Sequence, residues 1–194
     1  MEPSIEARVR LLLVAGDVSA AATLALNAIG PSVLRYLRSV LRDEEDAADA
    51  FSRFAEHLWQ GLPGYRGDSA LKTWAFRIAW NAAQNLRNEA WRQRARRFAT
   101  GEASRIAEEL RTKTAIRVER RRDGLERIRQ LLSPDDQSLL ALRIDQGLAW
   151  EEIAAIESSG GTPVQPNTLM KRFERLKAKL AELVQEQGLG DQPE

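Results

Sequence analysis

Hydrophobic side chains recur every three or four residues along most of the chain, which is the spacing of amphipathic helices. Alternating runs of β-branched residues, which are typical of strands, are missing. The pattern therefore predicts an all-α protein. Turn signals divide it into a helical pair over 4–30 that breaks near Gly16-Asp17, a helix after Gly30-Pro31 that ends near residue 41, and helices over 46–59, 71–97, 134–146, 150–156 and 166–185.

The helix expected from residue 71 onward has two different sides. One is apolar, with Leu71, Trp74, Ala75, Ile78, Ala79, Ala82 and Leu86. The other mixes aromatic, basic and amide side chains: Thr73, Phe76, Arg77, Trp80, Gln84 and Arg87. Because bases stack on aromatic rings while cations attract phosphates, this mixture indicates a single-stranded nucleic acid. The alternative is that Phe76 and Trp80 pack against a neighbouring helix and the arginines form a solvated rim.

The chain is nearly neutral as a whole, but its charged residues are clustered. The 194 residues carry a formal net charge of only +1, so affinity for nucleic acid must come from local groups. Residues 87–97 hold five arginines against one glutamate, a cluster that could contact duplex phosphates or could simply be an exposed helix end. The absence of cysteine rules out disulfides and thiolate metal sites and suits a cytoplasmic protein. The apolar run at 11–15 is too short to cross a bilayer, so no membrane insertion is expected.

Two helices joined by a turn, the second of them basic on its outer side, have the outline of a helix-turn-helix. They are the helices expected over 150–156 and 166–185. The alternative is an amphipathic helical hairpin with a solvated basic side. The cations that lie off the apolar stripe are Lys171, Arg172, Arg175, Lys177 and Lys179.

Catalytic chemistry is missing from the pattern. His57 is the only histidine, and no Ser/His/Asp arrangement, phosphate-binding glycine loop or metal-ligand spacing appears. The sequence predicts neither an enzyme nor a bound metal or cofactor.

Two segments resemble one protein family. Tyr65-Arg66-Gly67-Asp68-Ser69 and the following Thr73-Trp74 through Trp80-Asn81 resemble the promoter-melting segment of extracytoplasmic-function sigma factors, a class of bacterial transcription initiation subunits. The stretches 131–135, 147–156 and 167–177 resemble the promoter −35-reading domain of the same family. The resemblance implies a first domain over 1–97, a linker over 98–122, a second domain over 123–188 and a tail over 189–194.

The resemblance also implies roles for residues. The promoter −10 region would be held by Tyr65, Arg66, Asp68, Ser69, Lys72, Thr73, Trp74, Phe76, Arg77, Trp80, Asn81, Gln84 and Arg87. The −35 element would be read by Asn167, Thr168, Met170, Lys171, Arg172 and Arg175. The polymerase would dock on Asp46, Asp49, Phe51, Ser52, Arg53 and Phe54. The implied partners are core RNA polymerase, promoter DNA as duplex and single strand, and an anti-sigma factor, with no small-molecule substrate.

Several positions depart from the family pattern. The turn over 158–167 is longer than usual, and Ala149 stands where a capping serine is common. Met170 replaces a common base-contacting cation, while Ser52 and Arg53 replace the usual glutamine and glutamate of the docking helix. These departures keep two alternatives open: an autonomous helix-turn-helix regulator, and a sigma-like adaptor without promoter activity.

Overall fold

The computed structural model describes residues 3–97, 129 and 131–186. The predicted linker at 98–122 and the tail at 189–194 lie outside these residues. Every regular element in the described ranges is helical, which confirms the all-α prediction.

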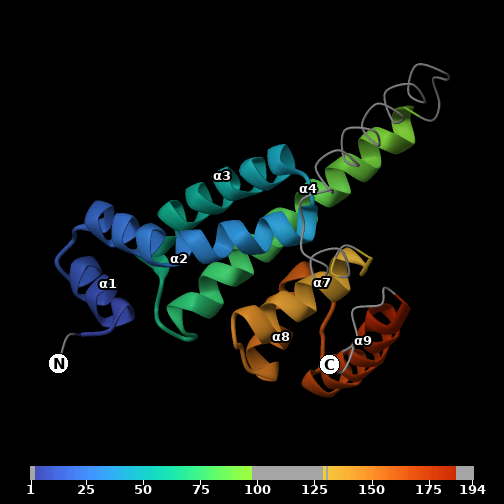
Figure 1. Cartoon of the computed structure of the whole chain (residues 1–194). Helices are drawn as coiled ribbons and strands as arrows, with labels where there is room; N and C mark the ends of the chain where they lie inside the picture. The colour runs from blue at the N-terminus through green and yellow to red at the C-terminus, as the bar shows by residue number, and fades with distance from the viewer. Residues whose placement is uncertain (1–2, 98–128, 130, 187–194) are drawn as a thin grey trace, which may run out of the picture.

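The N-terminal half consists of four helices (Figure 1): α1 (Ile5–Val14), α2 (Val18–Leu41), α3 (Glu44–Gly61) and the long α4 (Leu71–Arg97). A short 3-10 turn, η1 (Leu62–Gly64), follows α3. Polar side chains set the helix starts, because Ser4, Asp17 and Asp43 each accept hydrogen bonds from backbone N–H groups of the first turn.

The predicted break at Gly30-Pro31 is wrong, since α2 runs through both residues. Gly30 is buried, and a Cβ at this position would lie 3.4 Å from the ring of Phe51 on α3. The glycine therefore serves close packing between α2 and α3. Proline removes one helical hydrogen bond, but here the packing of the surrounding helix outweighs that loss.

The C-terminal half comprises α7 (Pro134–Leu140), the π-helical turn η2 (Ala141–Asp145), α8 (Trp150–Glu157), the 3-10 turn η3 (Ser158–Gly160) and α9 (Pro166–Glu186). Ser133 caps α7, because its hydroxyl accepts from the Asp136 N–H at 3.1 Å with Pro134 in the first turn. Regular helical spacing after Leu140 would turn Ile144 toward the core, yet its side chain is 58% exposed. A π-helical turn adds a residue to the helical repeat and so changes the side that Ile144 faces.

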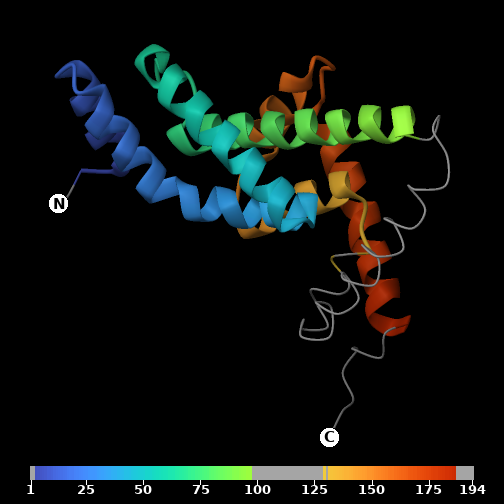
Figure 2. The same cartoon turned by 90° about the horizontal axis from the view of Figure 1, so that it is seen from above.

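One hydrophobic core runs through both halves. In α2, α3 and α4 it is built largely from alanines, and in the C-terminal half from Leu139, Leu142, Ile153, Ile156 and Phe173. Helix α2 packs on α7, and α4 packs on α8, so residues far apart in sequence share one interior (Figures 1 and 2). This packing decides which side of α4 remains accessible.

Candidate nucleic-acid and polymerase interfaces

The side of α4 expected to meet nucleic acid is not uniformly exposed. Phe76 is fully buried, with its ring edge-on to Tyr36 of α2 at a centroid distance of 5.5 Å. The expectation that Phe76 faces a nucleic acid is therefore wrong in this arrangement. Helix α4 is packed against α2, α3 and the C-terminal half, which a two-sided helical pattern does not reveal.

Trp74 supports the loop that leads into α4. Its ring stacks at a tilt on Tyr65, with centroids 5.3 Å apart, and covers Gly61, where a Cβ would lie 3.1 Å from the indole. Both aromatic rings are half-buried. They therefore form the base of the loop 65–70, from which Arg66 and Asp68 extend into solvent.

Glu6 of α1 organises the same loop. One of its carboxylate oxygens lies 3.1 Å from the Tyr65 hydroxyl and pairs with Arg10 at 2.8 Å. The other accepts from the Leu71 N–H, the first residue of α4, at 3.4 Å. Arg10 crosses Gly67, whose φ of +81° and lack of a Cβ permit the approach. Sequence reasoning missed Glu6 and Arg10, because an acid and a base four residues apart are common on any exposed helix.

Several α4 side chains contact the C-terminal half. Lys72 donates to the Gln146 carbonyl at 2.7 Å, and the buried Thr73 hydroxyl donates to the Glu152 carboxylate. Arg87 pairs with Asp135 at 2.7 Å. A cleft of about 240 Å³ remains between the halves, and its lining includes Trp80, Gln84, Arg87, Asp135, Glu157, Gly160 and Arg172.

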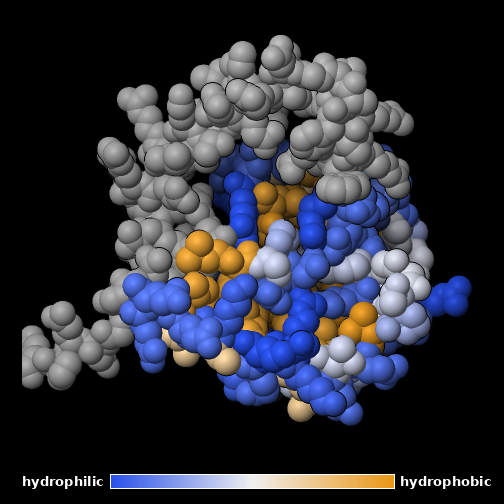
Figure 3. Space-filling view, turned by 90° about the vertical axis from the view of Figure 1, so that its right-hand side faces the viewer, coloured by the Kyte–Doolittle hydropathy of each residue, from blue (hydrophilic) through white to orange (hydrophobic). Residues whose placement is uncertain are grey.

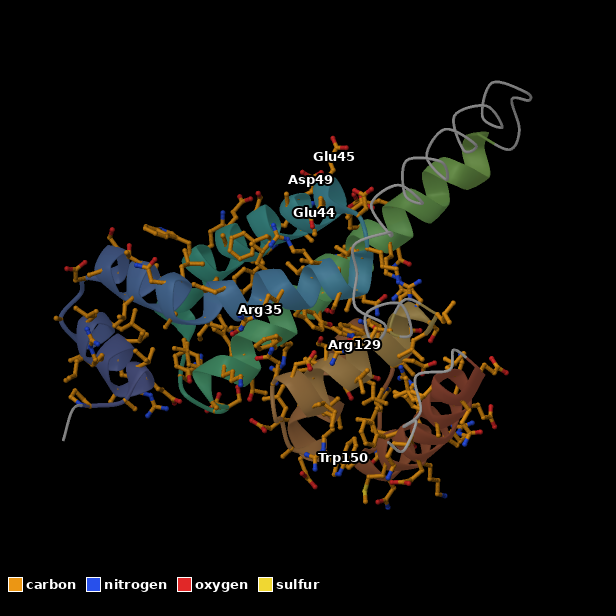
Figure 4. The ribbon with its side chains drawn as sticks, in the orientation of Figure 1. Arg35, Glu44, Glu45, Asp49, Arg129 and Trp150 are labelled. Carbon is orange, nitrogen blue, oxygen red and sulfur yellow. The ribbon has the colours of Figure 1, made fainter. Side chains whose placement is uncertain are left out.

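Helix α3 presents an acidic outer side at its N-terminal end (Figure 4). Glu44, Glu45 and Asp49 are exposed there, while Asp46 is half-buried. Carboxylates in the first helical turn are favoured by the helix dipole, so this charge also stabilises α3.

The two phenylalanines of α3 face inward, whereas Trp59 near its C-terminal end is exposed. Phe54 is fully buried, so the expectation that it docks the polymerase is wrong. Phe51 is half-buried against Gly30. Arg53 instead forms a two-pronged ion pair with Glu89 of α4, with N–O distances of 2.8 and 2.9 Å, and this contact raises the pKa of the guanidinium. Arg53 thus joins the acidic helix to α4.

The outer side of α9 carries most of the expected duplex-reading residues. Helix α9 lies toward the side of the molecule that Figure 3 turns to the viewer, where the coloured surface is mostly hydrophilic with separate hydrophobic patches. The exposed residues of the expected set are Asn167, Thr168, Met170, Lys171 and Arg175.

Arg172 differs from these neighbours. Its guanidinium pairs with Asp136 of α7 at 3.2 Å and Glu157 of α8 at 3.4 Å, and its side chain is only 24% exposed. Burial raises the pKa of Glu157 above its ordinary value, while Arg172 opposes the rise. Arg172 therefore holds three helices together.

Trp150 and Ala149 shape the start of α8. The Trp150 ring packs edge-on against Phe173 of α9, with centroids 5.4 Å apart, and the Arg143 guanidinium lies 4.4 Å from its centroid (Figure 4 labels Trp150). The Ala149 side chain cannot cap the helix, but its N–H donates to the Glu152 carboxylate at 2.8 Å. Of the two hydrogen bonds in a capping box, the one from the N-cap N–H to the glutamate is therefore present, and the one accepted by the N-cap side chain is missing.

Neither a metal site nor a membrane-spanning helix is found in the described ranges. No group of three potential ligands gathers within them, and His57 directs a ring nitrogen to the Arg53 carbonyl at 2.7 Å. In the same residues, no helix combines the length and apolar character needed to cross a bilayer.

Comparisons with known proteins agree on one family. A family model described as sigma-70 region 2 matches residues 26–97. The RNA polymerase sigma-H factor of Pseudomonas aeruginosa is 30% identical over 138 residues, which cover 64% of this chain and 72% of that protein. The chain belongs to the sigma-70 family of RNA polymerase sigma factors. It is thus a subunit that directs RNA polymerase to promoters, as the sequence resemblance predicted.

Two solved structures share the fold. The structure of CnrH in complex with the cytosolic domain of CnrY has a TM-score of 0.60 at 17% identity, covering 94% of this chain and 99% of that chain. RpoE in complex with the anti-sigma factor NepR from Bartonella quintana has a TM-score of 0.55 at 20% identity, covering 82% and 94%. Both comparisons extend the likeness beyond the region-2 match into the C-terminal helices of this sigma factor.

Proposed function

We propose that this sigma factor is of the extracytoplasmic-function type and opens promoters with α4 and the loop before it. Residues 1–97 would hold the −10 region, residues 98–122 would link, and residues 123–188 would read the −35 element. The observation that carries the proposal is the arrangement of Trp80, Asn81, Gln84 and Arg87 on one side of α4, opposite its alanine-rich core side. A stacking ring, two amides and a cation suit an unwound strand.

The loop at 65–70 is the proposed site for a base turned out of the stack. Arg66 and Asp68 reach into solvent from a support of two packed aromatic rings and the Glu6 carboxylate. A supported loop with exposed polar ends can present hydrogen-bonding groups to a base edge. The energy needed to unstack the base is roughly a few kcal/mol, which these contacts would offset.

Duplex reading is assigned to the outer side of α9. Its exposed polar residues lie on a single helix in a helix-turn-helix, the arrangement in which the second helix enters the major groove. Lys171 and Arg175 would contact phosphates or guanine edges, and Asn167 and Thr168 would contact base edges near the start of the helix. Arg172 is assigned a positioning role because its guanidinium is paired with two carboxylates.

The acidic side of α3 is the proposed dock for core polymerase. Glu44, Glu45 and Asp49 present exposed carboxylates on a helix held firmly by buried Phe54, which suits a basic surface on the partner. Catalysis would then belong to the polymerase. The complex of RpoE with the anti-sigma factor NepR favours regulation by an anti-sigma factor, and the complex of CnrH with a cytosolic domain of CnrY favours a cytoplasmic location for such a partner.

The first experiment is a competition for core RNA polymerase between this protein and a housekeeping sigma factor. We expect displacement, and we expect D49K (Asp49→Lys) to weaken it, because the substitution reverses one exposed charge. N85K (Asn85→Lys) introduces the same lysine side chain at an exposed position on α4 and serves as the control. Tight duplex binding by the free protein without polymerase binding would instead favour an autonomous helix-turn-helix regulator.

A further inference from the structure

We propose that the turn between α8 and α9, residues 158–165, is an internal plug that occupies the strand-binding side of α4. The plug must leave before single-stranded DNA can bind. This inference rests on the function proposed for α4 and adds a means of regulating it. In the sequence, this turn differs from that of an ordinary helix-turn-helix only by its greater length.

The first contact joins Gly160 to Trp80. A Cβ added to Gly160 would lie 2.8 and 3.0 Å from two ring atoms of the indole, closer than a side chain can approach. The turn therefore meets the ring through a residue that has no side chain. Trp80 is the aromatic residue to which the proposed function assigns base stacking. The plug therefore covers the central residue of the proposed strand-binding site.

The second contact joins Ser159 to Asn81. The serine hydroxyl lies 3.1 Å from the amide oxygen of Asn81. Ser159 and Gly160 thus touch two consecutive α4 residues of the proposed strand-binding side. The additional length of the turn is explained by these contacts, because the residues that reach α4 belong to the extension.

The turn holds its own shape. The Val164 N–H donates to the Ser158 hydroxyl at 2.9 Å, and the Gly161 N–H donates to the Ser158 carbonyl at 3.1 Å. Gly161 has a φ of +97°, a conformation that glycine adopts without strain. A turn braced in this way can bind α4 without first becoming ordered, which lowers the entropy cost of closing.

Carboxylates extend the plug on both sides. Asp135 pairs with Arg87, and Glu152 accepts from Thr73, so anionic oxygens occupy donors that would otherwise contact DNA phosphates. The carboxylate oxygens in these contacts are anionic acceptors, as the phosphate oxygens of a bound strand would be. The cleft of about 240 Å³ left beside Trp80 has walls from both α4 and the turn, so a strand lying along α4 would collide with the turn.

The test compares two glycine substitutions in the full chain. G160A (Gly160→Ala) places a methyl group against Trp80, whereas G64A (Gly64→Ala) places one where no atom lies within 4 Å. Each free protein is titrated into fluorescein-labelled single-stranded DNA of mixed sequence, and binding is followed by fluorescence anisotropy. Because a hidden site lowers apparent affinity by the fraction of molecules that are open, we expect G160A to bind about tenfold more tightly than the parent and G64A to match the parent.

Equal binding by G160A and the parent, whether tight or undetectable, would overturn the plug. S159A (Ser159→Ala) provides a second, milder opening of the same contact, and we expect a smaller gain in affinity. The proposed function is tested separately by promoter opening with W80A (Trp80→Ala) in reconstituted holoenzyme. Loss of opening in W80A with no gain in G160A would reject the plug alone, whereas full opening by W80A would reject the strand-binding role itself.

Discussion

Tyr36 of α2 and Ser138 of α7 meet inside the core through a hydrogen bond of 2.8 Å between their hydroxyl groups, although 102 residues separate them in sequence. Both side chains are buried, and burial raises the pKa of Tyr36 above its ordinary value. The two halves of this sigma factor therefore join through a polar contact enclosed by apolar packing. Such a contact is specific, because either hydroxyl left alone would be buried without a partner.

Replacing either partner should destabilise the closed arrangement. We expect Y36F (Tyr36→Phe) to lower the free energy of unfolding by about 1–2 kcal/mol, since the Ser138 hydroxyl would lose its partner. Urea denaturation measures this loss, provided that the dependence of the unfolding free energy on urea concentration has the same slope in both proteins. The double variant with S138A (Ser138→Ala) should cost less than the sum of the single variants, and strict additivity would contradict the coupling.

The two aromatic residues on one side of α4 should respond differently to truncation. We expect F76A (Phe76→Ala) to cost about 3–5 kcal/mol of folding free energy, because the ring is fully buried. W80A should leave folding largely intact and reduce promoter opening in the holoenzyme. Permanganate reactivity of unpaired thymines reports the opening, and thermal unfolding reports the stability. Equal effects of the two substitutions on both measurements would refute this division.

Substitutions of two arginines on α9 should affect different properties of the protein. We expect R175A (Arg175→Ala) to weaken −35-dependent initiation by about 1–3 kcal/mol without loss of stability, because its side chain is exposed. R172A (Arg172→Ala) should lower the free energy of unfolding by about 1–3 kcal/mol, because two carboxylates lose a charged hydrogen-bond donor. Transcription from promoters with altered −35 sequences and urea denaturation distinguish the outcomes. A stable R172A protein with changed sequence preference would instead make Arg172 a base contact.

Glu6 provides a test of the loop before α4. We expect E6A (Glu6→Ala) to reduce discrimination among −10 sequences while polymerase binding stays unchanged, because Tyr65 and the Leu71 N–H lose an acceptor. E6Q (Glu6→Gln) keeps an acceptor oxygen and should recover part of the discrimination. Competition between promoter variants measures it. Parent-like discrimination in E6A would show that Trp74 and Tyr65 suffice to support the loop.

Glu157 should give stability a pH dependence of definite sign. Because burial raises its pKa above 4.5, the folded protein binds this proton more tightly than the unfolded chain does. Its contribution is most favourable at low pH, and it declines as pH rises from about 4.5 through the raised folded-state pKa. In E157Q (Glu157→Gln) that decline should disappear from the unfolding free energy measured over this interval. An identical pH profile in both proteins would contradict the shift.

The sequence predicts well those helix boundaries that depend on neighbouring residues. The Ser133-Pro134 start of α7, the end of α2 before the acidic run and the extent of α9 follow from capping residues and helical spacing. The helical class and the family followed from the same patterns. These features depend on neighbours within a few residues, which a single sequence displays directly.

The errors arise where distant residues meet. Nothing near Phe76 or Phe54 in the sequence shows that Tyr36 or other helices cover them, so aromatic residues in polar surroundings were assigned to binding. Local sequence rules predict that the helix ends at Gly30. In the structure the helix continues, and the missing side chain of Gly30 lets the Phe51 ring pack closely against it. The π-helical turn that exposes Ile144 has no local signature comparable to a cap. The contacts of Trp80 with Gly160 depend on how the halves pack, which no periodicity encodes.

The alanines buried between α2, α3 and α4 have a consequence for mutational tolerance. Positions such as Ala22, Ala50 and Ala79 have no accessible surface, and the helices pack closely through them. Adding even a few methyl groups there should cost about 1–3 kcal/mol, because the helices would have to separate. A deep mutational scan that selects for folded protein should therefore find its strictest positions among these small, chemically plain residues. The conspicuous aromatic and basic residues of the surface should vary freely in that selection and become restricted only when transcription is selected.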